Sequence, residues 1–594
     1  MKKFNLVLAT IIGAAVFSGC ALSKMIKLAA DQELTVKPNP LELHGGKVSY
    51  NMSAVLPPKM LPSGKVYTIK NFYQYGDKEM EVGEIEFVAD DFPNSSSSTS
   101  RKSADFEFDY NPELNPGKLM VQGIAEDPRN GKTKESPKME VAVGIITTSQ
   151  YVKDFYATSY ADHGYVEKEE LIPTNINFYF QQGRSVLVPS LNIKGESNRS
   201  KQKDLSAFIA EKNVTKTVTI TGTHSPEGPE RINSSLSNER AERIEEYYRR
   251  QMNRYDYKGM ADSIKFILKP VVEDWSDFQF ALRDYDGISQ ESKDMMMRIV
   301  SGSGSFEDKE DQLQKVDGYD KVFEDIYPGL RSAKTEILTV KPKKSNAEIA
   351  VLSKQIVDGS SEMDTLTTEE FLFSATLTPS LEEKAAIYKA ATKDGSWVAH
   401  NNLGAVYLEM AKAADEGDRD KFIQDALTQL EIADNKEDKA EIGINMASAY
   451  AMQGEYSKAY ETLDGAAGMA SNEQRGKING MKGAVEIRMG DYEEAKASLN
   501  NAVEDNVVTF NSGLVNLLTG DYNSAETYFS TVSENTESAE SYYLSAVTAA
   551  RQKQASDVID NLKMAIEKDS SYKDKALNDL EFVNFADAVA QAIR

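Results

Sequence analysis

One short pattern occurs three times near the C-terminus and limits what that region can fold into. Each copy reads Gly, then Glu or Asp, then Tyr, with Ala three residues after the tyrosine; the copies begin at Gly454, Gly490 and Gly520, 36 and 30 residues apart. Runs rich in alanine and larger apolar residues precede the glycines, as at 445–450, and indicate helices. A repeat of this length buries its apolar faces only by stacking on neighbouring copies.

The pattern resembles the tetratricopeptide repeat, whose period is about 34 residues. An earlier copy carries Gly404 and Tyr407 in a first helix and Ala426 in a second. The resemblance implies an all-α solenoid of five or six repeats over residues 363–594. It also implies that the repeated glycines, tyrosines and alanines are structural, and that a concave groove holds a peptide or a partner protein.

Acidic residues are concentrated in the same region. The formal net charge of the chain is −25, and residues 351–594 contain 42 Asp and Glu against 22 Lys and Arg, a difference of −20. This sign argues against nucleic acid as a partner and against binding of anionic lipid through a basic patch. The acidity fits a partner with a basic surface, and it fits solubility alone equally well.

The N-terminus has the pattern of an export signal. Lys2 and Lys3 precede a mostly apolar run over residues 4–17, which is too short for a membrane-spanning helix. The run ends in Phe-Ser-Gly-Cys, which resembles a bacterial lipobox. The resemblance implies a signal peptide over residues 1–19, acylation of Cys20 with fatty acids such as palmitate, and a lipid-anchored tether over 20–33. The alternative is an ordinary secretory signal cleaved elsewhere.

The residues after Cys20 bear on the side of the membrane that the chain faces. The chain resembles lipoproteins of Bacteroidota, in which surface export is associated with acidic residues just after the lipidated cysteine. Residues 21–27 contain no acid. We therefore expect an outer-membrane lipoprotein that faces the periplasm and is attached to the membrane by its acyl chains. Cys20 is the sole cysteine, so the mature chain has no thiol free for disulfides.

Residues 34–148 show short alternating apolar and polar runs separated by turn residues. Examples are the runs at 47–50, 65–69, 84–88, 105–108 and 139–143. Alternation with period two and such frequent turns predicts an antiparallel, immunoglobulin-like β-sandwich. No cluster of polar residues nominates a site in it, so we expect a spacer.

A mixed α/β segment follows a connector at 149–172. Its predicted elements are a strand at 175–180, a helix within 202–212, strands at 215–221, 264–268 and 336–340, and a helix from about 236. This order, over residues 173–342, resembles the OmpA-like domain that binds peptidoglycan, with an insertion at about 270–328. A polar linker is expected at 343–362.

The resemblance is carried by the motif Asn-x-x-Leu-Ser-x-x-Arg-Ala at 233–241. In that family an Asp and an Arg, fifteen residues apart, hold the ammonium and the carboxylate of diaminopimelate. The matching positions here are Ser225 and Arg240. The resemblance therefore implies a peptidoglycan-binding site at Asn233 and Arg240 that lacks its acid at Ser225.

Glu227 or Glu230 could supply the missing acid in that site. Arg240 could still clasp a carboxylate in a charge-assisted fork. The alternative is that Arg240 is a surface cation paired with a nearby glutamate. Both readings stay open at the level of sequence.

The sequence offers no catalytic set. The four histidines lie in different segments without metal-ligand spacing, and no phosphate-binding loop or nucleophile motif occurs. We expect no enzyme, no cofactor and no metal. The expected function is a non-enzymatic scaffold that links the outer membrane to other envelope proteins of an assembly or secretion machine and to peptidoglycan. The alternative is a peptidoglycan anchor that keeps the envelope intact without a dedicated protein partner.

Overall fold

The structure is a computed structural model that describes residues 21–255, 263–271 and 274–594. The expected signal peptide and Cys20 lie outside the described residues. The chain divides into two compact units. The sandwich–solenoid unit comprises Met1–His163 and Ala350–Arg594, and the α/β unit comprises Gly164–Ile349.

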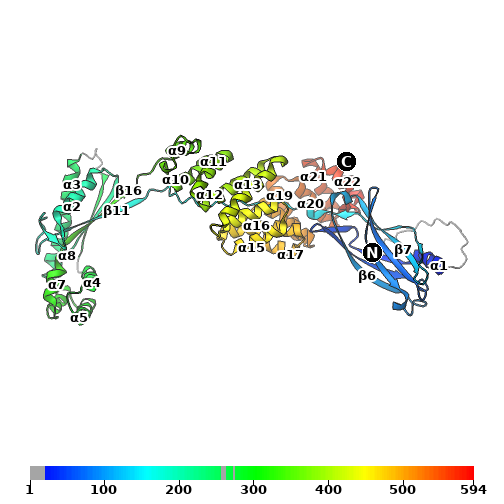
Figure 1. Ribbon diagram of the computed structural model, residues 1–594, viewed down its shortest axis with the longest axis horizontal. Coiled ribbons are helices and arrows are strands. Elements are labelled where there is room, and N and C mark those ends of the chain that lie inside the picture. Colours follow the sequence, from blue (N-terminus) through cyan, green and yellow to red (C-terminus); the bar gives the residue numbers. More distant parts are fainter. Residues whose placement is uncertain (1–20, 256–262, 272–273) are drawn as a thin grey trace. The chain divides into compact units, whose positions relative to one another are not determined.

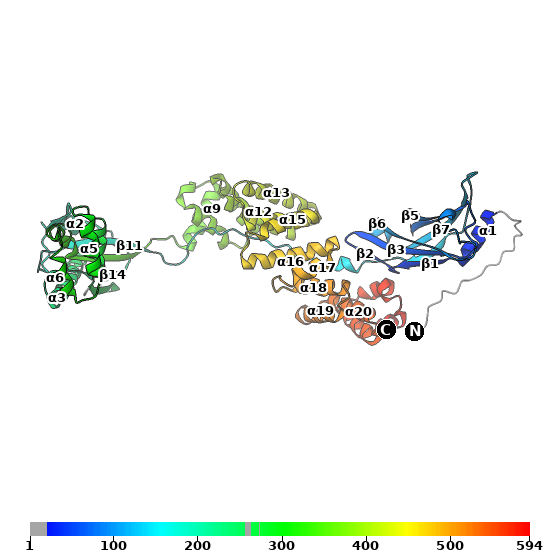
Figure 2. The ribbon, with the colours of Figure 1, turned by 90° about the horizontal axis from the view of Figure 1, so that it is seen from below.

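Two β-sheets enclose one core in the N-terminal part, as Figures 1 and 2 show. The first sheet has the order β1 (Glu33–Lys37), β3 (Lys47–Leu56), β2 (Leu41–His44) and β10 (Ile145–Ile146), with β6 (Ser100–Asp109) also paired to β3. The second has the order β5 (Lys78–Val88), β4 (Val66–Tyr75), β7 (Gly117–Asp127) and β8 (Lys132–Glu135), with β9 (Met139–Val143) also paired to β7. The predicted β-rich region is thereby confirmed.

Alternation along the strands builds this core. Val48, Tyr50 and Met52 of β3 are buried while the residues between them are more exposed, and Tyr67, Ile69 and Tyr73 of β4 are buried in the same cluster. Successive side chains of a strand point to opposite faces, so each sheet turns its apolar face to the other.

A short helix replaces most of the expected tether. The helix α1 (Ala21–Leu28) and the 3-10 turn η1 (Ala29–Asp31) pack on the sandwich. Leu22, Met25 and Ala29 are buried, at positions i, i+3 and i+7 of one helical face. That spacing makes an amphipathic helix, which gains stability by burying its apolar face against the sandwich core.

The C-terminal part consists of helix pairs, which confirms the predicted helical repeat. Five successive pairs lie within the described residues: α12 (Trp397–Ala413) with α13 (Glu416–Asp434), α14 (Ala440–Met452) with α15 (Tyr456–Ala467), α16 (Asn472–Met489) with α17 (Tyr492–Leu499), α18 (Asn506–Leu518) with α19 (Tyr522–Thr536), and α20 (Ala539–Gln552) with α21 (Ala555–Lys568). The flanking helices are α9 (Asn346–Asp358), α10 (Thr368–Ser374), α11 (Leu381–Ala391), α22 (Tyr572–Asn578) and α23 (Ala586–Ala592). Thus α9 occupies most of the expected linker at 343–362.

The repeated glycines turn the chain from the first helix of a pair to the second. Gly454, Gly490 and Gly520 have φ of 80°, 90° and 85°, in the left-handed region. Glycine enters that region without the steric cost of a Cβ, so it ends a helix there. The repeated alanines, such as Ala459 and Ala495, are fully buried.

The α/β unit contains a four-stranded mixed sheet. Its order is β11 (Leu171–Tyr179), β16 (Ser332–Val340), β14 (Thr215–Gly222) and β15 (Lys265–Pro270). Only β14 and β15 pair in parallel; the other two pairings are antiparallel. The helices α2 (Asn198–Ala210) and α3 (Glu230–Arg254) pack on this sheet, and a small hairpin, β12 (Asn192–Ile193) with β13 (Glu196–Ser197), precedes α2.

Five helices fill the chain between β15 and β16, the region of the expected insertion. They are α4 (Ser276–Arg283), α5 (Gln290–Ser301), α6 (Phe306–Leu313), α7 (Tyr319–Asp325) and α8 (Tyr327–Leu330), within the described residues. They have a hydrophobic core of their own, which includes Trp275, Phe278 and Met296. Most aromatic and methionine residues of the insertion therefore serve packing, whereas Phe280 and Met295 are exposed.

Candidate functional site

The motif loop and its arginine form a buried polar cluster in the α/β unit. The loop runs from the end of β14 to the start of α3, at residues 223–229. Gly222 lets α3 approach, because a Cβ there would lie 1.9 Å from the backbone oxygen of Ser237. Helix α3 begins at Glu230, earlier than the apolar pattern predicts, and places Asn233, Ser237 and Arg240 on its buried side.

Arg240 is almost fully buried, with 1% of its surface exposed. Its guanidinium donates to three backbone oxygens: Nε to Arg184 (3.1 Å), one terminal nitrogen to Thr223 (2.7 Å) and the other to Gln181 (3.4 Å). Burial, and secondarily the nearby Arg331, lowers the pKa of Arg240 to about 10. In this arrangement the fork fixes the loop to the strand end, and its donors are occupied by main-chain acceptors.

Ser225 contacts a second arginine that the motif does not include. Its Oγ accepts a hydrogen bond from Nε of Arg331 at 2.9 Å, and that guanidinium also pairs with Glu227 at 2.8 and 3.0 Å. Glu227 thus does supply a carboxylate beside Ser225, but to Arg331 rather than to Arg240. Arg331 lies directly before β16, and its side chain is 9% exposed.

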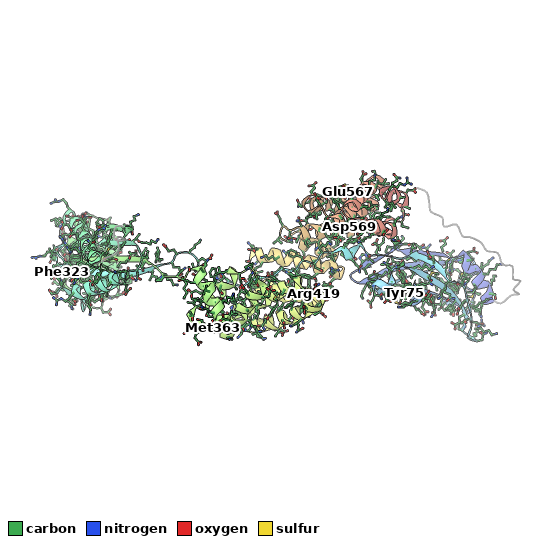
Figure 3. The ribbon with its side chains drawn as sticks, turned by 90° about the horizontal axis from the view of Figure 1, so that it is seen from above. Tyr75, Phe323, Met363, Arg419, Glu567 and Asp569 are labelled. Carbon is green, nitrogen blue, oxygen red and sulfur yellow. The ribbon has the colours of Figure 1, made fainter. Side chains whose placement is uncertain are left out.

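The inserted helices cover this loop. The ring of His224 packs edge-on against Phe306 of α6 at 5.5 Å between ring centres. Glu307, also in α6, accepts the backbone N–H of Glu230 at 2.9 Å. Phe323 of α7, labelled in Figure 3, lies 5.7 Å from the guanidinium of Arg331. The insertion therefore packs on the loop and on Arg331.

The side chain of Asn233 stabilises the loop through hydrogen bonds to its backbone. Its amide nitrogen donates to the backbone oxygens of Glu227 and Gly228, at 3.2 and 3.3 Å, and its own backbone oxygen accepts from Ser237. The side chains that carry the family resemblance therefore hold the loop in shape in this structure.

A second candidate site is the groove of the helical repeats, and the chain itself occupies it. The groove segment, residues 151–161, lies against the first helices of four repeats. Three asparagine side chains each bond both the N–H and the C=O of one residue of the segment: Asn511 with Lys153 (2.8 and 2.8 Å), Asn445 with Ser159 (2.8 and 2.8 Å), and Asn402 with Ala161 (2.7 and 3.0 Å).

Side chains of the groove segment also enter the solenoid core. Val152 and Ala157 are buried in it, and Phe155 packs against it. A Cβ at Gly480 of α16 would lie 2.8 Å from the ring of Phe155, so this glycine leaves room for the ring. The segment is thus held by apolar burial as well as by hydrogen bonds.

Two of the three asparagines leave a signal in the sequence, although Met481 stands at the corresponding position before Gly490. Asn445 and Asn511 each stand nine residues before the repeated glycine, Gly454 and Gly520. A polar residue at the same repeat position, on an otherwise apolar first helix, indicates a shared role on the groove face. The spacing does not reveal that the occupant is residues 151–161 of the same chain.

The sandwich is joined to the last repeats beside the groove segment. Arg551 of α20 forms a two-pronged pair with Glu581 (2.6 and 2.9 Å) and also lies 3.5 Å from Glu42 of β2. Glu581 accepts a further bond from Thr148 at 2.6 Å. A Cβ at Gly45 would lie 1.9 Å from the backbone oxygen of Met489, so the two surfaces meet closely.

A cavity of about 820 Å³ lies where the groove segment meets the last helices. Lys575 stands over the rings of Tyr151, Tyr572 and Tyr543, at 4.2, 5.2 and 5.6 Å, and burial lowers its pKa. Lys153 pairs with Glu540 at its rim. The mixed charges do not single out one ligand chemistry.

The described part of the chain contains no group of three or more His, Cys, Asp or Glu residues placed to hold a metal ion. Among the described helices, none combines the length and the apolar character needed to cross a membrane.

Comparisons with known proteins give structural likeness only. No protein-family model matches the chain, and no curated protein matches it. Among solved structures, it is similar to PilF of Pseudomonas aeruginosa (17% identity, 41% of this chain and 97% of that one, TM-score 0.27). It is also similar to a tetratricopeptide repeat protein from Parabacteroides merdae (15% identity, 42% of this chain and 97% of that one, TM-score 0.26). A third similar structure is the APC/C hetero-tetramer Cut9–Hcn1 (10% identity, 62% of this chain and 78% of that one, TM-score 0.31). Scores below 0.5 carry no argument, so the repeat assignment rests on the helix pairs themselves.

Proposed function

We propose that this protein is a lipid-anchored, periplasm-facing outer-membrane scaffold that links the membrane to partner proteins of an envelope assembly or secretion machine. It acts without catalysis. The observation that carries this proposal is the groove segment bound along the repeats. By binding it, the solenoid holds the sandwich and the repeats as one compact unit next to the proposed anchor at Cys20.

The bound groove segment also changes where we expect a partner protein to bind, since the tetratricopeptide resemblance implies binding in the groove. A partner peptide that entered the groove would have to displace the groove segment, whose tethering gives it a high effective concentration, on the order of millimolar for a short linker. We therefore place partner binding on the second helices of the pairs. We call them the outer helices, because the groove segment lies against the first helices. Ile432 of α13 and Met469, which follows α15, are exposed apolar residues there, 37% and 45% accessible.

The strand order of the α/β unit supports the proposal that it is an OmpA-like domain, and the two sheets support an immunoglobulin-like spacer. The motif at 233–241 supports the alternative function, a peptidoglycan anchor. The burial of Arg240 on three carbonyls and the pairing of Glu227 with Arg331 weigh against it. A diaminopimelate bound at Arg240 would have to replace these main-chain acceptors of its guanidinium.

Site-specific photocrosslinking in cells tests the scaffold proposal. A photoreactive residue at position 432 or 469 should give crosslinks to another envelope protein. The matched position is Glu409, whose carboxylate accepts from Thr158 of the groove segment, and it should crosslink only within the chain. Absence of intermolecular crosslinks from 432 and 469, or a partner crosslinked at 409, would overturn the assignment of the partner to the outer helices.

A further inference from the structure

The sandwich carries a basic surface on α1 and the adjoining turn, in a chain whose net charge is strongly negative. Residues 21–28 contain Lys24 and Lys27 and no acid. Residues 128–134, which form the turn between β7 and β8 and most of β8, contain Arg129, Lys132 and Lys134 and no acid. The basic surface, as used below, is these five cations.

Contacts bring the two segments together. Helix α1 packs on β7 and β8, and the ammonium of Lys134 donates to Oγ of Ser23 at 2.9 Å. The apolar face of α1 points into the sandwich, so Lys24 and Lys27 are exposed on its outer face, and Lys132 is exposed on β8. Figures 1 and 2 show α1 at one end of the sandwich, next to β7.

Five acids lie near the basic surface in sequence, and two of them are engaged by other groups. Asp127 pairs with Lys65 at 2.5 Å and lies 3.6 Å from Arg129, and Glu135 accepts from Gln122 at 3.1 Å. Asp31, Glu33 and Glu126 are the other acids nearby in sequence. Across the described residues, no ion pair within 4 Å is found for Lys24, Lys27 or Lys132.

The position of α1 in the chain indicates that the basic surface lies close to the membrane. Helix α1 begins at Ala21, the residue after the proposed acylation site. Consecutive Cα atoms are about 3.8 Å apart, and a helix of eight residues is about 12 Å long. Both lysines of α1 therefore stay within roughly 12 Å of the acylated residue, because the helix is packed and cannot act as a long tether.

We propose that the basic surface, formed by α1 and the β7–β8 turn, lies on the anionic phospholipid headgroups of the membrane that holds Cys20. The proposal rests on the lipid anchor of the proposed function. The net charge of the chain argues against binding of anionic lipid through a basic patch. The proposal replaces that expectation, because most of the excess negative charge lies in residues 351–594. At physiological ionic strength charges are screened over about 8 Å, so local charge decides contact with a headgroup.

The role of such a surface is orientation rather than added anchoring. Several acyl chains on one residue already hold a protein on a bilayer. Each cation near an anionic surface contributes about a fivefold gain in partition, so Lys24, Lys27 and Lys132 together favour one tilt of the sandwich over others by roughly 100-fold. The acyl chains therefore keep the protein at the membrane, and the lysines set the face it presents.

Vesicle binding of residues 21–594, the expected mature chain without the acylated cysteine and without the apolar signal peptide, isolates the basic surface. The vesicles contain either phosphatidylcholine alone or phosphatidylcholine and phosphatidylglycerol in equal amounts. We expect partition only to the second kind, weakening as salt rises. The triple variant Lys24→Glu, Lys27→Glu, Lys132→Glu removes three cations and adds three anions, so it should lower this partition by more than roughly 100-fold.

The matched control reverses three exposed lysines of the solenoid, Lys393, Lys421 and Lys436, and so changes net charge equally. It should leave partition near the unsubstituted value. Equal partition to both vesicle kinds, or equal losses in the two triple variants, would overturn the proposal. Mass spectrometry of the N-terminal peptide from cells reads the acyl groups separately, so a failed lipid anchor and a failed basic surface give different results.

Discussion

The side-chain amide of Asn445 bonds both the N–H and the C=O of Ser159, each at 2.8 Å, although the two residues are 286 positions apart. Both groups are buried. The groove segment is therefore held as a bound peptide would be. The asparagine side chain satisfies the backbone N–H and C=O of Ser159 as a neighbouring strand would. The repeats and the groove segment are therefore one folded structure.

Asn445→Ala should loosen the groove segment. The substitution leaves the buried backbone N–H of Ser159 without a partner, while its C=O keeps the amide of Asn401 at 3.1 Å, at a cost of about 2 kcal/mol. Hydrogen–deuterium exchange should rise several-fold across residues 151–161. Asn500→Ala, at an exposed position of the same solenoid, serves as the control and should leave that exchange unchanged. Unaltered exchange in Asn445→Ala would mean that the bonds of Asn445 contribute nothing to holding the segment.

Ser225→Asp should not create a peptidoglycan anchor. The new carboxylate would meet Arg331, which already donates to Ser225, while Arg240 stays on its three carbonyls. In co-sedimentation with purified sacculi, the native chain, Ser225→Asp and the exposed control Ser303→Asp should all remain in the supernatant. Strong sedimentation of Ser225→Asp alone would show that a ligand can reach Arg240, and sedimentation of the native chain that Arg240→Ala abolishes would support the anchor.

Gly45→Ala should separate the sandwich from the solenoid, and Gly46→Ala should not. Both glycines have positive φ, 54° and 84°, so both substitutions carry backbone strain. Only at Gly45 would the new Cβ meet another segment, the backbone of Met489 at 1.9 Å; around Gly46 nothing lies within 4 Å. We expect faster exchange at residues 486–492 in Gly45→Ala, measured against Gly46→Ala. Equal exchange in the two variants would contradict this close contact.

Glu310 should make the α/β unit less stable as pH rises. Burial raises the pKa of this carboxyl above its ordinary 4.5, and the hydroxyls of Tyr319 and Tyr327 donate to it. Between 4.5 and the raised pKa the folded state holds a proton that the unfolded state has lost, so the free energy of unfolding falls as pH increases through that window. Below 4.5 both states are protonated and the group contributes nothing to the pH dependence.

Denaturant unfolding over a pH series measures this effect. Trp275, which packs 4.6 Å from Phe306, reports on the α/β unit when Trp397, the other tryptophan, is replaced by Phe. Glu310→Gln should flatten the decline with pH, whereas Glu324→Gln, at an exposed position of α7, should not. A decline that persists unchanged in Glu310→Gln would assign it to other groups.

Local patterns carried much of the architecture. Alternation over residues 34–148 predicts strands because period two exposes and buries successive side chains, and the glycine–tyrosine–alanine repeat predicts helix pairs ended at Gly454, Gly490 and Gly520. The strand and helix order of the α/β unit is readable for the same reason. Each of these signals is a short pattern of neighbouring residues or its repetition along the chain, and both can be read directly from the sequence.

The partners of the polar side chains were decided only in three dimensions. The spacing of Ser225 and Arg240 indicates a family position, but Arg331, more than a hundred residues after Ser225, takes the contact with Ser225 and Glu227. The occupant of the groove is likewise set by pairings 241 to 358 residues apart. Secondary structure follows from the order of nearby residues; which buried donor meets which acceptor follows from the packing of distant segments, which no local pattern records.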